Sequence, residues 1–157
     1  MDLVVNASPL ILLCKAGHVR LLEELGDNVF VPCAVVNEVA AYPDDEAGSS
    51  VRSFPWINEV DVTVPDSIKA WDLGAGESEV IAYALKKEGA RPLLDDAEGK
   101  ACALAHGLKP LGTAGLLVLA KRSALIESVK PVLFMIRETG LWISDAVIEA
   151  IVKSAGE

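Results

Sequence analysis

The chain has 157 residues, of which 52% are hydrophobic and 24% charged, and its formal net charge at pH 7 is −9. This length and apolar fraction predict a single domain, residues 1–157, with a densely packed core and no linker. No apolar run is long enough to span a bilayer, and no basic segment precedes the first apolar residues, so we expect neither a membrane span nor a signal peptide. The negative charge repels a phosphate backbone unless divalent cations or a basic partner compensate for it, although solubility alone also explains the acidic excess.

Several common kinds of catalytic site have no counterpart in the sequence. Cys14, Cys33 and Cys102 do not have metal-type spacing, and each lies in an apolar helical context, so we expect buried, reduced thiols in a cytoplasmic protein. The two histidines have no partners at triad spacing, and Ser8 lacks the glycines of a nucleophile elbow. A P-loop and a dinucleotide fingerprint are missing as well. The sequence therefore gives no sign of a serine or cysteine hydrolase.

The first predicted elements are a short strand and two helices. Residues 3–5 form an apolar strand that ends at Asn6. Ser8 is followed by a proline, which is typical of a helix start, because a serine caps free amides and a proline at the first helical position loses no hydrogen bond. We therefore predict a helix over residues 10–16 and a second short helix over residues 18–25. Asn6 then lies at the tip of the first strand.

A second strand, a helix and a third strand follow. Residues 29–31 are apolar, and the proline after them leads directly into a helix that carries Glu38 among apolar neighbours. A buried, unpaired carboxylate is costly, so this segment by itself favours a Glu38 that faces solvent. Residues 41–55 are polar and contain Gly and Pro, which predicts a mobile connection with at most a short helix. Residues 57–64 alternate as in a strand with one exposed face.

The segment 74–107 contains most of the residues that can carry chemistry. A Gly-rich turn is followed by an amphipathic helix with Glu77 in its first turn, and then by a short apolar strand over residues 92–94. This strand ends in Asp95 and Asp96, and a second amphipathic helix follows with apolar positions at Ala101, Leu104 and Ala105. Ligands of open parallel sheets bind at the carboxyl ends of the strands, which is where Asp95 is expected to lie. Glu77 reaches the same crevice if its helix begins at that edge.

The last third of the chain predicts one more strand, over residues 108–111, and a helix over residues 116–121. Thr113 precedes this helix, where it is expected to be the N-cap, although the free amides of the same turn also suit a phosphate. Two further amphipathic helices are expected over residues 127–140 and 144–155, the second capped by Ser144. These helices carry more apolar side chains than a small sheet obviously needs. They either cover the second face of the sheet or form a homodimer interface.

Four segments, taken in order, resemble the DUF3368 branch of the PIN-domain family: VVNASPLILLCKAG, VFVPCAVVNEV, LGAGESEVIAYA and PLLDDAEGKACALAHGLKPLGTAGLL. The resemblance implies an α/β fold, a three-layer α/β/α sandwich with a central, mainly parallel sheet. It also implies acidic residues at one edge of that sheet, bound Mg²⁺ or Mn²⁺, and cleavage of RNA. Many such proteins are toxins of toxin–antitoxin pairs, so an antitoxin protein is an expected partner.

Carried over by motif, the metal ligands fall on Asn6, Glu38, Glu77 and Asp95. The catalytic carboxylates are then Glu38, Glu77 and Asp95, with Asp96 beside them as a group that orients the attacking water. Carboxylates brought together raise one another's pKa, and a hard divalent cation relieves their repulsion. Such a cation polarises a phosphodiester oxygen and activates a water for in-line attack.

Ser8 and Thr113, each close to a predicted helix start, are the candidate contacts for the RNA phosphates. Asn6 stands where a PIN nuclease normally has Asp, and its amide brings no charge, so we expect weaker metal affinity than four carboxylates would give.

Three functions remain open on the sequence. The first is a metal-dependent ribonuclease, and the second is a PIN-like domain that binds RNA or protein without cleaving. The third is a small-molecule or phosphate-handling α/β domain.

Overall fold

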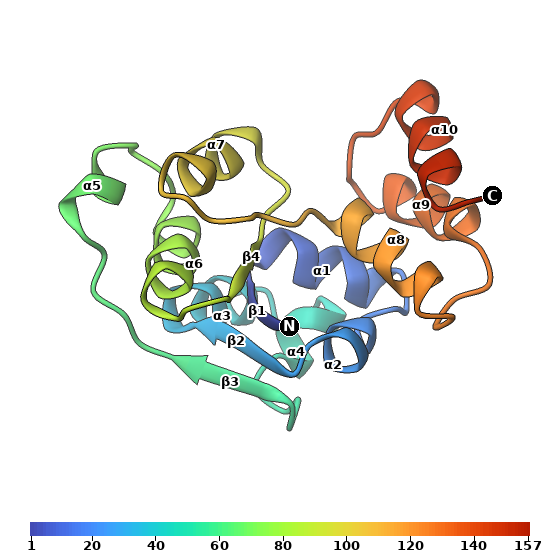
Figure 1. The fold of residues 1–157 in the computed structure, drawn as a ribbon. Coiled ribbons are helices and arrows are strands. Elements are labelled where there is room, and N and C mark those ends of the chain that lie inside the picture. The colour runs from blue at the N-terminus through green and yellow to red at the C-terminus, as the bar shows by residue number, and fades with distance from the viewer.

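The computed structural model describes residues 1–157 and is built around one four-stranded parallel sheet (Figure 1). The strands are β1 (Asp2–Val5), β2 (Asn28–Pro32), β3 (Ile57–Val60) and β4 (Arg91–Leu93). Their order in the sheet is β3-β2-β1-β4, and every neighbouring pair is parallel. Helices flank the sheet, so the predicted α/β class with a central parallel sheet is confirmed.

Ten helices surround these strands. They are α1 (Ala7–Lys15), α2 (Leu21–Leu25), α3 (Cys33–Ala40), α4 (Glu46–Ser50), α5 (Asp66–Lys69), α6 (Ala75–Lys86), α7 (Ala97–Ala105), α8 (Thr113–Arg122), α9 (Val129–Glu138) and α10 (Asp145–Ser154). Helix α6 packs on β1, β2 and β4, and α3 packs on α6, β2 and β3. None of the helices combines the length and the apolar character that a bilayer crossing requires.

The strand order reverses direction between β1 and β4. From β1 the chain proceeds to β2 on one side, whereas β4 returns to pair with β1 on its other side. Ligands of open α/β sheets bind at such a reversal, outside the carboxyl ends of the strands. The backbone N–H of Asn6 donates to the carbonyl oxygen of Leu93 at 3.2 Å, which holds the ends of β1 and β4 together. The residues that follow both strands therefore share one edge of the sheet.

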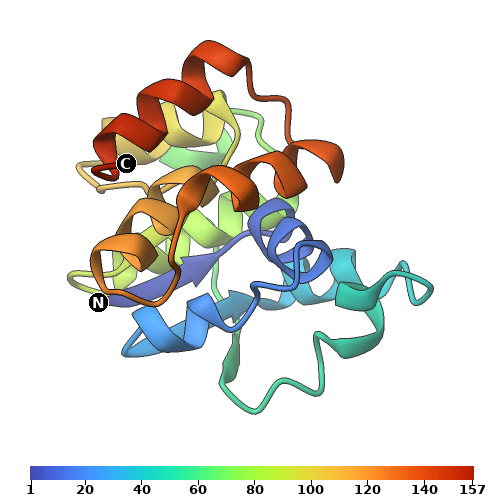
Figure 2. The ribbon, with the colours of Figure 1, turned by 90° about the vertical axis from the view of Figure 1, so that its right-hand side faces the viewer.

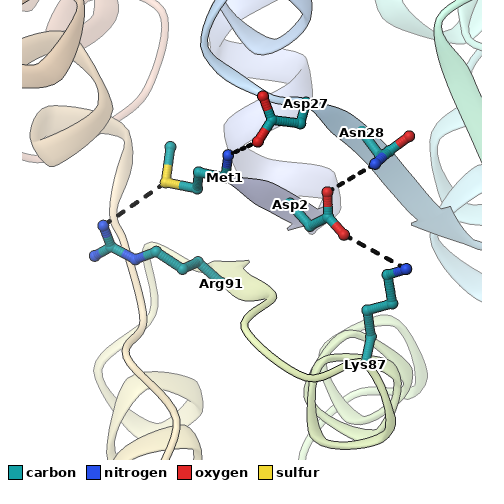
Figure 3. A network of polar contacts seen from close by, with 6 residues as sticks. All are labelled: Met1, Asp2, Asp27, Asn28, Lys87 and Arg91. Carbon is teal, nitrogen blue, oxygen red and sulfur yellow. Dashed lines mark hydrogen bonds and ion pairs between the residues drawn. The ribbon is translucent and has the colours of Figure 1, made fainter.

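The amino ends of the strands, opposite to Asn6, are held by a network of polar contacts (Figure 3). The Asp2 carboxylate accepts a hydrogen bond from Asn28 Nδ2 at 2.8 Å and pairs with Lys87 Nζ at 3.5 Å. The terminal ammonium of Met1 pairs with Asp27. These contacts join the starts of β1 and β2 to the segment after α6. They place cations at the edge where the strands begin, away from Asn6.

A single apolar cluster extends from Leu3 in β1 to Val152 in α10. Helix α9 contributes Val129, Val132, Leu133 and Ile136 to it and packs against α1, α8 and α10. In Figure 1 the three C-terminal helices gather on the right, beyond α1, and Figure 2 shows α10 above α8 and α9. Helix α8 also contacts α2, so the main contacts of these three helices are with α1, α2 and one another. A homodimer interface on these helices stays a prediction.

Two predicted strands are shorter than their sequence patterns. The third strand was expected over residues 57–64 but ends at Val60, because its partner β2 turns into α3 after Pro32 and leaves later residues without a ladder. The strand expected over residues 108–111 is reduced to Leu111, which bridges to Leu93. A longer strand does not form here for two reasons. The backbone N–H of Leu108 donates to the Ala103 carbonyl and closes α7, and Pro110 has no backbone N–H to donate to a neighbouring strand.

Three helix starts differ from the prediction. Helix α1 begins at Ala7, with Asn6 as its N-cap residue, so Ser8 lies inside the first turn and is not the cap. Pro9 also lies in this first turn, where a proline is tolerated. Helix α2 begins at Leu21 because the amide of His18 closes α1 on the Leu13 carbonyl. Gly112, not Thr113, is the N-cap residue of α8. The predicted cap by Ser144 is confirmed, since its side chain accepts the Val147 N–H.

The inward faces of two helices also differ from the prediction. In α7 the buried residues are Gly99, Cys102 and Ala103, whereas Leu104 is 62% exposed. Both sets of residues fit the same i, i+3, i+4 spacing, so the pattern alone could not set the rotation of the helix. Cys33 is only partly buried, because it precedes the buried stripe of α3, while Cys14 and Cys102 are buried as predicted. The short helix α5 has no clear periodic signal and was not predicted.

Candidate metal centre

Two side-chain oxygens from distant segments meet at Gly76. Asn6 is only 7% exposed, and its side chain makes no capping hydrogen bond to α1. A Cβ atom on Gly76 would lie 3.3 Å from Asn6 Oδ1 and 3.0 Å from Glu38 Oε2. The absence of a side chain at Gly76 therefore leaves the space in which an amide oxygen from the end of β1 and a carboxylate from α3 approach the start of α6. Glu38 itself remains exposed, as its own segment favoured.

Glu77 lies next to this point, in the first turn of α6. Burial raises the pKa of the Glu77 carboxyl above its ordinary value, and the negative charges of Asp96, Glu38 and Glu98 raise it further. A Cβ atom on Gly99 of α7 would lie 3.1 Å from Glu77 Oε1. A second helical glycine thus leaves room for a carboxylate. Glu77 connects the Asn6 and Glu38 pair to the start of α7.

The adjacent aspartates after β4 have different partners. Asp96 is the N-cap of α7, and its Oδ2 accepts the N–H groups of Glu98 at 2.8 Å and Gly99 at 3.0 Å. Its Oδ1 takes no part in these bonds. Both oxygens of Asp95 are engaged with Thr113: Oδ1 accepts its N–H at 2.8 Å and Oδ2 accepts its hydroxyl at 2.6 Å. Asp95 therefore satisfies the start of α8 from outside that helix.

The predicted site residues thus divide into two groups. Asn6, Glu38, Glu77 and Asp96 surround the start of α6, whereas Asp95 is directed to Thr113. Thr113 is fully buried and both of its donors go to Asp95, so it supports that carboxylate and does not face solvent. Ser8 is exposed on the first turn of α1.

Sequence reasoning missed three groups near this edge. Glu79 accepts the N–H of Ala34 at 3.0 Å and so satisfies the start of α3, although it lies only two residues from Glu77. Gly76 and Gly99 admit the carboxylates, as described above. A glycine inside a helix costs roughly 1 kcal/mol relative to alanine, so two helical glycines beside acidic residues were the available signal.

The donor set fits a hard divalent cation. Amide and carboxylate oxygens are the ligands that Mg²⁺ prefers, and none of the ion pairs of the protein involves Glu38, Glu77 or Asp96. The negative charge around Glu77 is therefore not neutralised by a basic side chain. No group of three or more His, Cys, Asp or Glu side chains is arranged to hold a metal ion by itself. Mg²⁺ commonly binds through one or two carboxylates and keeps several waters, so the fit depends on the Asn6 oxygen and on water.

Comparison with known proteins gives one match. The family model described as a PIN domain, DUF3368, matches residues 2–157, which is essentially the whole chain. A search of curated proteins and a search of solved structures returned no match. The family match indicates a nuclease-type domain and agrees with the parallel sheet and its acidic edge. The chain therefore belongs to the DUF3368 family of PIN domains.

Proposed function

We propose that this protein is a metal-dependent endoribonuclease that hydrolyses RNA phosphodiester bonds with Mg²⁺ or Mn²⁺. The observation that carries the proposal is the approach of Asn6 Oδ1 and Glu38 Oε2 to Gly76, beside a Glu77 whose pKa is raised by burial and neighbouring carboxylates. Oxygens from β1, α3, α6 and the start of α7 are thus concentrated where no basic side chain compensates for them. A divalent cation is the simplest species that relieves this arrangement.

The side chains have distinct roles in this proposal. Glu38 and Glu77 supply charge to hold the cation, and Asn6 supplies a neutral oxygen. Asp96, whose Oδ1 is not used in capping α7, orients the attacking water. When bound, Mg²⁺ or Mn²⁺ polarises a phosphodiester oxygen and lowers the pKa of a water. Asp95 keeps its place in the proposal as a candidate ligand, although its bonds to Thr113 have to open before it can reach a cation.

The partners follow from charge and from the family. The net charge is −9, and the acidic edge repels RNA unless cations are bound. A basic protein that covers this edge would restrain the enzyme, which is how we propose that an antitoxin acts on it. We also propose that the protein acts in the cytoplasm, where its three free cysteines would stay reduced, and that it forms a homodimer.

The test is an assay of RNA degradation with Mn²⁺ or Mg²⁺ on purified protein, comparing the natural chain with Glu77→Gln and Glu88→Gln. Glu88 is an exposed residue just beyond α6, so its substitution removes the same charge away from the site. We expect cleavage to fall by about a hundredfold or more in Glu77→Gln, since a lost metal ligand removes several kcal/mol of transition-state stabilisation, and to stay unchanged in Glu88→Gln. Circular dichroism controls for folding. Cleavage that survives Glu77→Gln contradicts the proposal.

A second function is favoured by two observations. Asn6 replaces a carboxylate, and no three acidic side chains are arranged to hold a metal ion. Both fit a PIN-like domain that binds RNA or a protein without cutting. Calorimetry with Mn²⁺ separates the two functions: an absence of binding, together with an absence of cleavage, favours the second.

A further inference from the structure

A cavity of about 390 Å³ lies next to the candidate metal centre, on the side of Asp95. Its polar lining includes Asp95, Lys100 and Gly112, and its apolar lining includes Trp142, Val147 and Ile151. The cavity therefore lies between two parts of the chain. On one side are the carboxyl end of β4 and the starts of α7 and α8, and on the other are the segment before α10 and α10 itself. Its volume falls within the usual range for sites that take a small organic group.

Lys100 is a free cation inside this cavity. Lys100 is half-buried, and no hydrogen bond or ion pair joins its ammonium to the protein. Every other half-buried Lys or Arg side chain has a protein oxygen as its partner. These side chains are Lys87, Arg91, Lys121, Lys130 and Arg137. A Cβ atom on Gly112 would lie 3.0 Å from Lys100 Nζ and 3.4 Å from Asp95 Oδ1. The ammonium thus lies near the first turn of α8, where the Asp95 carboxylate already accepts the Thr113 N–H. An unpaired cation at this place is suited to a phosphate.

The apolar side of the cavity presents an unusually free aromatic ring. Trp142 is 93% exposed, and Val147 beside it in the cavity lining is 48% exposed. Exposed indole faces stack on nucleobases with little dependence on the base. A phosphate site and a stacking surface therefore line one cavity, a combination that matches a nucleotide better than it matches an apolar peptide.

We propose that this cavity is a nucleotide subsite for single-stranded RNA, in which Lys100 binds the phosphate next to the one that is cleaved and Trp142 stacks on the attached base. The inference rests on the proposed ribonuclease function for its choice of RNA. It adds the claim that substrate binding extends from the acidic edge over Asp95 to the segment before α10. Lys100 and Trp142 are then positioning residues for the substrate.

The test measures binding without cleavage. A short 2′-O-methylated single-stranded oligoribonucleotide with a fluorescent label is titrated with protein in Mg²⁺, and anisotropy and tryptophan quenching are recorded. We expect Lys100→Gln and Trp142→Ala each to weaken binding at least about fivefold, and Trp142→Ala to lose most of the quenching. Lys109→Gln and Trp71→Ala are the matched controls, because both residues are exposed and outside the cavity, and they should stay within about twofold.

Salt dependence gives a readout that a structural role would not change. Removing one phosphate contact should make the slope of log K against log salt shallower by about 0.7 in Lys100→Gln only. If the natural protein cleaves no RNA but binding depends on Lys100 and Trp142, the proposed function fails and this inference stands. If cleavage is present but neither variant changes binding, the inference is overturned. It is also overturned if Trp142→Ala lowers the molar mass in sedimentation without changing affinity, because the cavity is then an interface between copies.

Discussion

The raised pKa of the Glu77 carboxyl makes one contribution to how the stability of the metal-free protein depends on pH. Because burial and the neighbouring carboxylates favour its protonated form, the folded chain holds this proton more tightly than the unfolded chain. The contribution of Glu77 to the free energy of unfolding therefore falls as pH rises from the ordinary Glu pKa through the raised value. A bound cation removes this penalty, so metal affinity should increase over the same pH range.

Glu77→Gln removes the titrating group and is expected to flatten this part of the stability profile. In the presence of a chelator, the variant should unfold at a higher temperature than the natural protein near pH 7. The difference should shrink as pH falls toward the ordinary Glu pKa of about 4.3 and disappear below it, where Glu77 becomes protonated in both states. Thermal unfolding followed by circular dichroism measures it. Glu88→Gln should keep the natural profile. An unchanged pH dependence of stability in Glu77→Gln would show that burial and the neighbouring carboxylates do not raise the pKa of Glu77.

Asn6→Asp adds a carboxylate where Asn6 and Glu38 meet, and it should have two opposite effects. Mn²⁺ should bind more tightly, by about tenfold, because the site gains a unit of negative charge. The metal-free protein should become less stable at neutral pH, since the new carboxylate is largely buried and lies close to Glu38. Calorimetry and chelator-treated thermal unfolding measure the two effects. If metal affinity does not increase, Asn6 lies outside the metal site.

At the scale of secondary structure, three carboxylates near the site stabilise helix starts. Glu79 accepts an amide of α3, Asp96 caps α7, and Asp95 binds the first residue of α8. Carboxylates interact favourably with the positive end of a helix, and each hydrogen bond to a charged group contributes about 1.5–3 kcal/mol. The same acidic residues that make the edge negative therefore also fix the helices that surround it.

Asp95→Ala is expected to lower the free energy of unfolding by about 2 kcal/mol, because it leaves the fully buried Thr113 without its partner. Asp95→Asn should lose less, since an amide still accepts the Thr113 N–H. Urea unfolding measures both variants, and Mn²⁺ calorimetry on Asp95→Asn separates capping from metal binding. We expect a smaller loss of affinity than in Glu77→Gln. A complete loss in a stable Asp95→Asn protein would make Asp95 a ligand, as the motif predicts.

On the scale of the whole molecule, the sheet and the C-terminal helices share one apolar cluster. Ile148 and Val152 of α10 belong to the same cluster as the β1 strand, and α9 packs against α1. This packing supports the proposal that residues 1–157 form one domain. The acidic edge and the cavity beside it then depend on the correct placement of helices from both halves of the chain.

The single-domain proposal predicts one cooperative unfolding transition. Far-UV and near-UV circular dichroism should give coincident urea curves, because loss of α8–α10 would expose the core that α1 covers. Leu133→Ala, which truncates a fully buried α9 side chain, should lower the midpoint of both curves equally and cost about 2–5 kcal/mol. Two separate transitions, only one of them sensitive to Leu133, would show that the C-terminal helices form an independent unit.

Local patterns in the sequence determined most of the elements of this protein, with α5 as an exception, and predicted the edge at which its polar residues gather. Short apolar runs predicted β1, β2 and β4, and alternation predicted β3, whereas the run over residues 108–111 was wrongly expected to form a fifth strand. Placing Asn6 and Asp95 after β1 and β4 predicted a shared edge, because carboxyl ends of parallel strands lie together. The tertiary structure alone decided the rotation of α7, the separate directions of Glu77 and Glu79, and the different partners of Asp95 and Asp96. Periodicity is the same for a helix turned by one or two residues, and adjacent aspartates are equivalent until distant residues such as Thr113 are brought to one of them. Those contacts join parts of the chain that no local pattern relates.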